Sequence, residues 1–175
     1  MELTRRDALL ALAGGGLVAS AAFAEGRTDA PATELTDEDR ETLLAIAEVL
    51  YPSSVTVTET FVETYVPGRQ AVDGAYLGGL GEALTAIRAT SRRETGRGFA
   101  SNGRGLRNDV LRETGADRAY ADPEGTVAQR IRYYVVDELL YALYTTPKGA
   151  ELVGNENPKG YPGGVDAYQR PPMGE

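Results

Sequence analysis

The side chains available for chemistry are few, because the chain contains neither His nor Cys. Their absence excludes a Ser-His-Asp triad, a thiolate nucleophile, iron–sulfur ligation, covalent c-type haem attachment and zinc sites built on His or Cys. The adjacent carboxylates of Asp137 and Glu138 could take part in acid–base chemistry. Neighbouring residues of a helix diverge by about 100°, so we do not expect these two to converge on one substrate. We therefore predict no catalytic residue in this chain, and a cofactor-independent enzyme that uses Asp137, Glu138 or a tyrosine is the weaker alternative.

Two further patterns indicate ligand binding only weakly. The carboxylates of Asp117, Asp122 and Glu124 could attract calcium, but their spacing differs from that of an EF-hand. The glycines around Gly79-Leu80 could belong to a nucleotide-binding loop, but no strand precedes them. We expect neither a metal nor a cofactor in this chain, and we interpret the glycines as positions that allow two helices to approach closely.

The chain is acidic, with 26 Asp and Glu residues against 18 Lys and Arg residues and a formal net charge of −8. This balance argues against nucleic-acid binding, which needs a basic face. Its only lysines are Lys148 and Lys159. An acidic chain that avoids lysine is typical of proteins solvated at high salt, so we expect a halophilic archaeon as the source. A GC-rich genome that favours Arg codons is the alternative.

Basic residues gather in one region of this acidic chain, at Arg92, Arg93, Arg97, Arg104 and Arg107. Cations are favoured near the negative pole of a helix dipole, so we interpret the region mainly as a solvated helix end. A docking patch for an acidic partner is the alternative.

Residues 1–24 have the organisation of an export signal. The pair Arg5-Arg6 precedes an apolar stretch from Ala8 to Val18, and a cleavage site follows with small residues at Ala22 and Ala24. The segment from Thr4 to Leu10 resembles the twin-arginine (Tat) motif. An uncleaved anchor is the alternative, but the stretch is short for a bilayer span. We predict that the Tat translocase exports the folded chain to the extracytoplasmic face of the cell membrane, which it contacts only through its leader or its partners.

The rest of the chain is predicted to be all-α: a single small helical domain over residues 36–175, after a flexible lead over residues 25–35. Apolar residues recur at helical spacing in four segments before the longest one: 36–51, 58–65, 72–93 and 106–113. Thr36 and Asp39 are spaced to cap the first of these. Pro67-Gly68 is expected to end the second, and Leu106, Val110 and Leu111 are expected to face inward from the fourth. The β-branched residues 53–58 could form a strand, although no partner strand is evident.

A long central helix is predicted from Thr126 to Tyr144. One apolar stripe runs along it, through Val127, Ile131, Tyr134, Val135, Leu139, Ala142 and Leu143. We expect Arg130 and Asp137, which are seven residues apart, to form an ion pair at its edge. After Pro147 we expect an irregular C-terminal segment rich in Gly, Asn and Pro. Its shaped surface is the candidate for docking a partner, through Tyr144, Pro147, Gly154, Asn155, Asn157, Gly160, Tyr161, Pro162 and Gly163.

The order of these features resembles the gluconate 2-dehydrogenase subunit 3 family. The resemblance rests on the Tat-like leader, Leu50-Tyr51-Pro52, Phe61-Val62 and Gly79-Leu80. Its most specific part is the C-terminal block, with Leu143-Tyr144-Thr145-Thr146-Pro147, Gly154-Asn155-Glu156-Asn157 and Gly160-Tyr161-Pro162-Gly163-Gly164. The family usually has Gly-Gly-Asn and a Trp in this block, whereas here only Gly154-Asn155 is present and Trp is absent.

The resemblance implies a largely helical accessory subunit that carries the export signal for a flavin-dependent sugar-acid or alcohol dehydrogenase and stabilises it. It implies that FAD and the active site lie in a large subunit of the GMC type, and that a cytochrome subunit often accepts the electrons. It implies no catalytic residue in the small subunit. A free-standing extracytoplasmic protein that binds a small ligand with the Gly/Asn/Tyr loop is the alternative.

Overall fold

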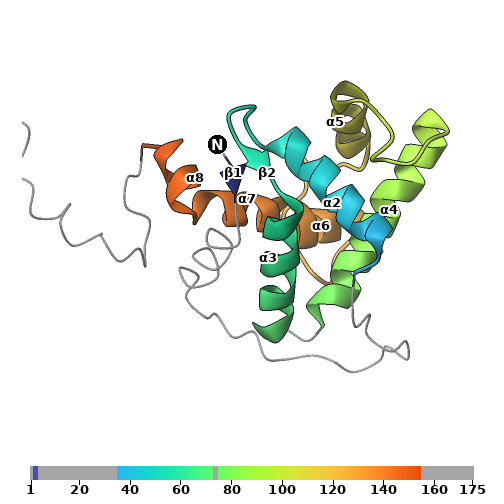
Figure 1. The fold of residues 1–175 in the computed structure, drawn as a ribbon. Coiled ribbons are helices and arrows are strands. Elements are labelled where there is room, and N and C mark those ends of the chain that lie inside the picture. Colours follow the sequence, from blue (N-terminus) through green and yellow to red (C-terminus); the bar gives the residue numbers. More distant parts are fainter. Residues whose placement is uncertain (1, 4–34, 73–74, 155–175) are drawn as a thin grey trace, which may run out of the picture.

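The computed structural model describes residues 2–3, 35–72 and 75–154. This part is largely helical, which confirms the predicted all-α fold (Figure 1). Two short strands are β1 (Glu2–Leu3) and β2 (Thr56–Val57). The helices are α2 (Asp37–Leu50), α3 (Glu59–Val72), α4 (Tyr76–Thr95), α5 (Arg104–Glu113), α6 (Val127–Ile131), the π-helix η1 (Arg132–Asp137), α7 (Glu138–Tyr144) and α8 (Pro147–Glu151). In this part of the chain no helix is both long and apolar enough to cross a membrane.

Helix α2 begins as the sequence predicts. The Thr36 hydroxyl accepts a hydrogen bond from the Asp39 backbone N–H, and the Asp39 carboxylate accepts one from the Thr36 backbone N–H, which together form a capping box. The helix ends before Pro52, at Tyr51. Leu35 is buried in the core, so the expectation of a flexible lead is wrong at its last residue; residues 25–34 lie outside the described part. Burying the apolar side chain of Leu35 is more favourable than leaving it exposed to water on a mobile segment.

Helix α3 corrects one prediction, and the segment before it answers a question that the sequence left open. It continues through Pro67-Gly68 to Val72 instead of ending near Tyr65. A proline removes one backbone donor, but its fixed φ is compatible with a helix, and the preceding turns bury Phe61, Val62 and Val66 against the core. Residues 53–58 contain the strand β2, whose partner is β1 at the far N-terminal end of the chain. Sequence patterns did not reveal that partner, because a two-residue strand carries almost no periodicity.

Helix α4 contacts α2, α3, α5, α6 and η1. It begins at Tyr76, four residues later than predicted, and ends at Gly96, whose φ of 69° is the left-handed conformation that favours glycine at a helix C-terminus. A Cβ built on Gly79 would lie 2.2 Å from Cζ of Tyr134. The expectation that glycines in this segment allow close helix approach is therefore confirmed at Gly79. Gly78 and Gly81 face open space instead.

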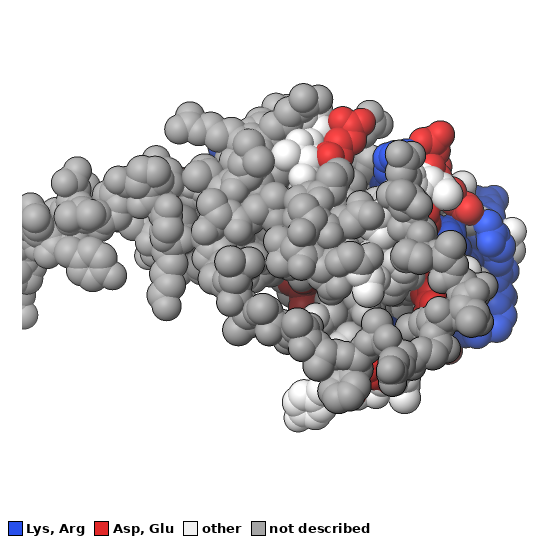
Figure 2. Space-filling view, turned by 90° about the horizontal axis from the view of Figure 1, so that it is seen from below, with Lys and Arg blue, Asp and Glu red and all other residues white. Residues whose placement is uncertain are grey.

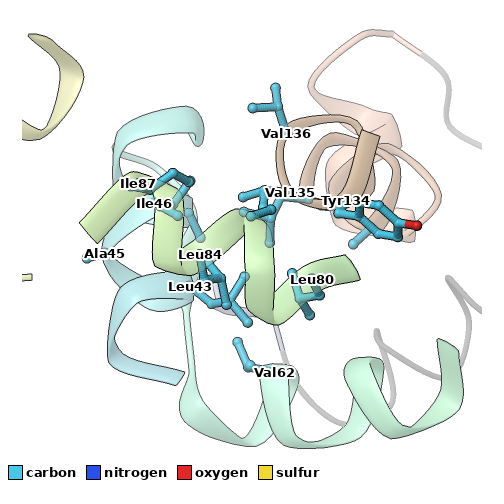
Figure 3. Close-up of a cluster of buried hydrophobic side chains, with 14 of the residues drawn as sticks. Leu43, Ala45, Ile46, Val62, Leu80, Leu84, Ile87, Tyr134, Val135 and Val136 are labelled. Carbon is cyan, nitrogen blue, oxygen red and sulfur yellow. The ribbon is translucent and has the colours of Figure 1, made fainter. Parts of the chain in front are cut away.

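The core forms where α4 meets its neighbours (Figure 3). Leu80, Leu84 and Ile87 of α4 are fully buried. Around them, Figure 3 shows Leu43 and Ile46 of α2, Val62 of α3, and Tyr134 and Val135 of η1. Burial of these side chains, about 1.5–3 kcal/mol each before the entropy of ordering them, holds the helices together.

Helix α5 turns a different face inward from the one we predicted. Val110 and Leu111 are buried as expected, but Leu106 is 50% exposed. The inner position of the first turn belongs to Arg107, which donates to the carbonyl of Ala100 and pairs with Glu48 on α2. Arg107, Val110 and Leu111 follow the spacing of three and four that defines one helix face, and Leu106 lies beside that face.

The predicted long helix from Thr126 to Tyr144 is present as the continuous run α6–η1–α7, and it packs centrally against α4. Its middle turn is π-helical, which the sequence did not predict. Thr126 caps the run through a capping box with Gln129. Ile131, Tyr134, Val135, Leu139, Ala142 and Leu143 are buried as predicted, whereas Val127, in the first turn, is exposed.

The predicted ion pair between Arg130 and Asp137 is wrong. Arg130 pairs with Glu82 on α4 at 2.9 Å, and Asp137 pairs with Arg132 at 2.6 Å. The π-helical turn explains the change, because it brings residues five apart, such as Arg132 and Asp137, onto one face.

Candidate partner-docking surface

The candidate docking residues fall on both sides of the last described position. Tyr144, Pro147 and Gly154 belong to the described part. Asn155, Asn157, Gly160, Tyr161, Pro162 and Gly163 lie outside it, as do the export-signal residues Arg5 and Arg6 and the cleavage-site residues Ala22 and Ala24. The surface can therefore be built from α7, α8 and the residues that lead to Gly154.

A tight corner joins α7 to α8, where we expected an irregular segment after Pro147. The Thr146 hydroxyl donates to the carbonyl of Leu143 at 2.8 Å and accepts from the N–H of Gly149 at 3.0 Å. Thr146 is thus the N-cap of α8, and Pro147 occupies the first helical position, where its missing N–H has no consequence. This explains the Thr-Pro of the C-terminal block physically: it begins a new helix.

Gly149 holds the two helices at this corner together. A Cβ at this position would lie 1.7 Å from the carbonyl oxygen of Leu143, which is backbone and cannot turn away. Ala150 is fully buried beside it. Gly154 then ends the segment with φ of 75°, as expected for a glycine that reverses the chain after a helix.

Four exposed apolar side chains belong to α7 and to the residues directly after α8. Tyr141 and Tyr144 of α7 are 40% and 44% exposed, and Leu152 and Val153 after α8 are 38% and 60% exposed. We call these four residues the C-terminal apolar surface. Tyr141 and Tyr144 lie on the same face of α7, because they are three residues apart. Only Tyr144 belonged to the predicted docking set; the signal for Leu152 and Val153 was an apolar pair directly before a turn glycine.

The other exposed large apolar residues of the described part are dispersed. Leu106 is on α5, Tyr120 is in the loop over residues 115–126, and Val127 is at the start of α6. Single apolar residues on a surface are ordinary, whereas a cluster indicates a contact surface. The four residues of the C-terminal apolar surface belong instead to two consecutive elements of the chain, α7 and the residues directly after α8.

An aromatic cluster supports α7 from behind. Tyr65 donates to the Glu138 carboxylate at 2.8 Å, and its ring stacks on Phe61. The Tyr51 hydroxyl donates to the carbonyl of Leu139 at 2.7 Å, and burial raises the pKa of Tyr51. Tyr51 therefore stays a neutral donor at any physiological pH, and both bonds fix the first turn of α7.

A small cavity lies beside this cluster, lined by residues that include Tyr65, Tyr76, Tyr134, Glu138 and Leu139. Its volume is about 10 Å³, roughly the room of one water molecule. A sugar acid does not fit there. The Gly/Asn/Tyr loop, which the small-ligand alternative requires, lies outside the described residues.

The other candidates from the sequence do not assemble into a site. Asp137 is held by Arg132 and Glu138 by Tyr65, so the two adjacent carboxylates have separate partners. Asp122 accepts from the backbone N–H of Glu124, a local turn. Within the described residues, no three or more acidic side chains come together as metal ligands would.

The basic region is largely neutralised by acidic side chains. Figure 2 shows blue side chains gathered at the edge where α4 lies, with red ones next to them. Arg92 pairs with Glu38 at 2.7 Å, Arg93 with Glu94 at 2.7 Å, and Arg107 with Glu48. Arg104 donates to the carbonyl of Tyr51 instead. Most of the cations that we predicted as one patch thus fasten α4 and α5 to α2, and this weakens the alternative of a docking patch for an acidic partner.

One ion pair is buried, and it fixes the start of α2 against α4. Arg88 pairs with Asp39 at 2.5 Å, and both side chains are about 90% buried. Burial alone would raise the pKa of Asp39, but hydrogen bonds from Thr36 and Arg88 and the charge of Arg88 lower it below its usual value. Asp39 is therefore ionised at neutral pH.

Comparison with known proteins gives no match: no family model fits the chain, and no curated protein and no solved structure is significantly similar to it. The resemblance to the gluconate 2-dehydrogenase subunit 3 family therefore stays a prediction that rests on the quoted motifs.

Proposed function

We propose that this chain is a non-catalytic accessory subunit that carries the Tat export signal for a flavin-dependent sugar-acid or alcohol dehydrogenase and stabilises it. The observation that carries the proposal is the C-terminal apolar surface, which a rigid α7–α8 corner holds exposed. In this arrangement FAD and the reacting substrate belong to a GMC-type large subunit, and a cytochrome subunit takes the electrons.

The chemistry of the surface fits a protein partner. Two tyrosines supply large apolar rings with few rotatable bonds, so little conformational entropy is lost when they are covered. Leu152 and Val153 add aliphatic area beside them, and the side chains of all four are uncharged. We expect the large subunit to present a mainly apolar face with hydrogen-bond acceptors for the two phenolic hydroxyls.

The rigid corner makes this surface suitable for recognition. Thr146, Pro147 and Gly149 fix the angle between α7 and α8 through backbone contacts, and the Tyr51 and Tyr65 hydroxyls fix α7 from the other side. A surface that is ordered before binding loses less entropy on binding. The residues of the C-terminal block that the resemblance singles out are thus, where described, the ones that shape the surface.

The export role follows from a separate feature, the leader with Arg5-Arg6. The Tat translocase carries folded proteins, which suits a cargo whose flavin must be bound before export. A chain with its own leader can bring such a partner across by staying bound to it.

Docking is tested by co-purification of the dehydrogenase with purified variants of this chain. We expect Tyr144→Ser and Val153→Ser each to weaken binding at least tenfold, which corresponds to about 1.4 kcal/mol, since a few buried aromatic and aliphatic side chains dominate most interfaces. Tyr120→Ser and Leu106→Ser are the matched controls, because Tyr120 is more exposed than Tyr144 and Leu106 is nearly as exposed as Val153, but both lie elsewhere in the fold. Equal losses in the control variants would contradict docking through this surface.

Export is tested by replacing Arg5 and Arg6 with Lys and following the dehydrogenase by activity and flavin content. We expect it to accumulate inside the cell while its complex with this chain stays intact. A dehydrogenase that still reaches the extracytoplasmic face would show that another chain carries it.

A further inference from the structure

The strand β1 is formed by Glu2 and Leu3, at the very start of the predicted leader, and it pairs with the folded domain. Its partner is β2, the pairing is parallel, and the register places Glu2 beside Thr56 and Leu3 beside Val57. Figure 1 shows the N-terminal strand running beside β2, between α2 and the α7–α8 region in that view. A segment that is expected to be removed after export is thus in backbone contact with the part that is expected to remain.

The β2 segment is anchored at both ends by hydrogen bonds that do not involve β1. At its start, the N–H of Val55 donates to the carbonyl of Pro52, and Val55 is buried. At its end, the Thr58 hydroxyl accepts from the N–H of Phe61 and so caps α3. A rigid extended segment with β-branched residues presents backbone donors and acceptors that an added strand can use.

We infer that the β2 edge is a binding site for an extended backbone and that its occupant in the precursor is the chain's own N-terminus. Recognition is of the β-augmentation kind, in which main-chain hydrogen bonds supply the contact. Two residue pairs make a weak ladder, so the contact is reversible. It exists only when α2 and α3 are folded, because these helices hold β2 in place.

The consequence for export rests on the proposed function. Arg5 follows Leu3 by only two residues in the sequence. A translocase that must surround the arginines therefore competes with the β2 edge for the same segment. Docking of β1 would hold back the signal until the strand is released, and cleavage after Ala24 would leave the edge free.

The test uses the full-length precursor, purified from the cytoplasm of a strain without the Tat translocase. The chain has no cysteine, so a pair introduced as Glu2→Cys and Thr56→Cys is the only source of a disulfide. Paired residues on adjacent strands are about 4.7–4.9 Å apart, within the range of about 4.4–6.8 Å that a disulfide spans. Thr56 is exposed, so its substitution leaves the core intact.

The matched control is the pair Glu2→Cys and Glu41→Cys. Glu41 is also exposed and is separated from Glu2 by a loop of similar length, but it lies in the first turns of α2, away from β2. Under the same mild oxidant we expect the Thr56 pair to cross-link at least tenfold faster than the Glu41 pair, and we expect the difference to vanish in urea. Equal rates in buffer overturn the inference, whether both pairs react or neither does. Because no partner or translocase is present, this failure would leave the proposed function standing, and a failed export assay would leave a positive cross-link standing.

Discussion

Gly79→Ala tests the closest contact between α4 and the central helix. A Cβ on residue 79 would lie 2.2 Å from Cζ of Tyr134 and 2.5 Å and 2.6 Å from the two Cε atoms of the ring. Carbon atoms normally approach no closer than about 3.5 Å, so the ring must move by more than about 1 Å. Its room is limited, because Tyr133 packs edge-on against it at 4.9 Å and Tyr76 lies 6.1 Å away between ring centroids.

Two opposing effects contribute to the change in the free energy of unfolding that we expect for Gly79→Ala. Overpacking of a core costs about 1–3 kcal/mol. Replacing a helical glycine with alanine stabilises a helix by about 0.8–1.0 kcal/mol. Gly81→Ala is the matched control, because it is in the same helix and nothing lies within 4 Å of its Cβ. Only the gain in helix stability applies to it. We therefore expect Gly81→Ala to be stabilising and Gly79→Ala to lie about 1–3 kcal/mol below it.

Urea unfolding followed by circular dichroism at 222 nm measures both variants. For a domain of this size, each kcal/mol corresponds to about 2–4 °C in Tm, so thermal unfolding should separate the two by several degrees. Comparison of Tyr134→Ala with the double variant Gly79→Ala/Tyr134→Ala tests whether the ring of Tyr134 causes the loss of stability. In this background Gly79→Ala should be neutral or stabilising, because the clash is gone.

Equal stability of Gly79→Ala and Gly81→Ala would refute the reasoning. It would mean that the ring of Tyr134 moves aside at no cost, and that Gly79 has no packing role. A Gly79→Ala variant that stays less stable in the Tyr134→Ala background would place the contact elsewhere.

Two further predictions concern the α7–α8 corner and the buried ion pair. Gly149→Ala should disrupt the corner, because its Cβ would meet the carbonyl oxygen of Leu143. We expect it to reduce partner binding, measured by co-purification, more than Gly154→Ala does. Equal binding by the two variants would contradict this prediction. Asp39→Asn should destabilise the domain by up to about 3–5 kcal/mol at pH 7, because it leaves the buried Arg88 with only the more distant and half-exposed carboxylate of Glu38, at 3.6 Å. The pKa of Asp39 is lowered in the folded state, so this contribution is present above the unfolded pKa of about 3.9 and is lost as pH falls through the folded value. Urea unfolding at a series of pH values should therefore show the wild type and Asp39→Asn converging in stability below about pH 4, and a constant difference would contradict the pairing.

Signals that lie close together in the sequence predicted the fold best. The Thr36–Asp39 capping box, the stop before Pro52 and the buried positions of the central helix all depend on neighbours within a few residues, and all except Val127 were found as predicted. Leu106 and the Arg130–Asp137 pair were misplaced for a different reason. Which of two adjacent faces turns inward depends on the helix on the other side, here on Glu48 of α2 and Glu82 of α4, and no pattern within one helix contains that information.

The docking surface was predictable only in part. The Thr-Pro pair and Gly154 indicated a shaped segment, but we expected a loop because prolines and glycines dominate it. The structure uses them for a short helix, with Thr146 as cap, Pro147 as first residue and Gly149 as the point of closest contact. A glycine can allow a close packing contact, as Gly149 does, or a backbone turn, as Gly154 does, and which of these roles it has depends on how close the preceding helix lies.

The π-helical turn explains how one helix can remain buried over its whole central length. Ile131, Val135, Leu139 and Leu143 are all buried, and each is four residues after the one before. In a regular α-helix, at about 100° per residue, twelve residues turn through about 1200°, so Leu143 would point about 120° away from Ile131. A π-helix has roughly 4.4 residues per turn, or about 82° per residue, so the six residues of η1 remove about 108° of that rotation. The remaining deviation is about 12°, and the four side chains lie on one line. The π-helical turn also accounts for the pairing of Arg132 with Asp137, five residues on.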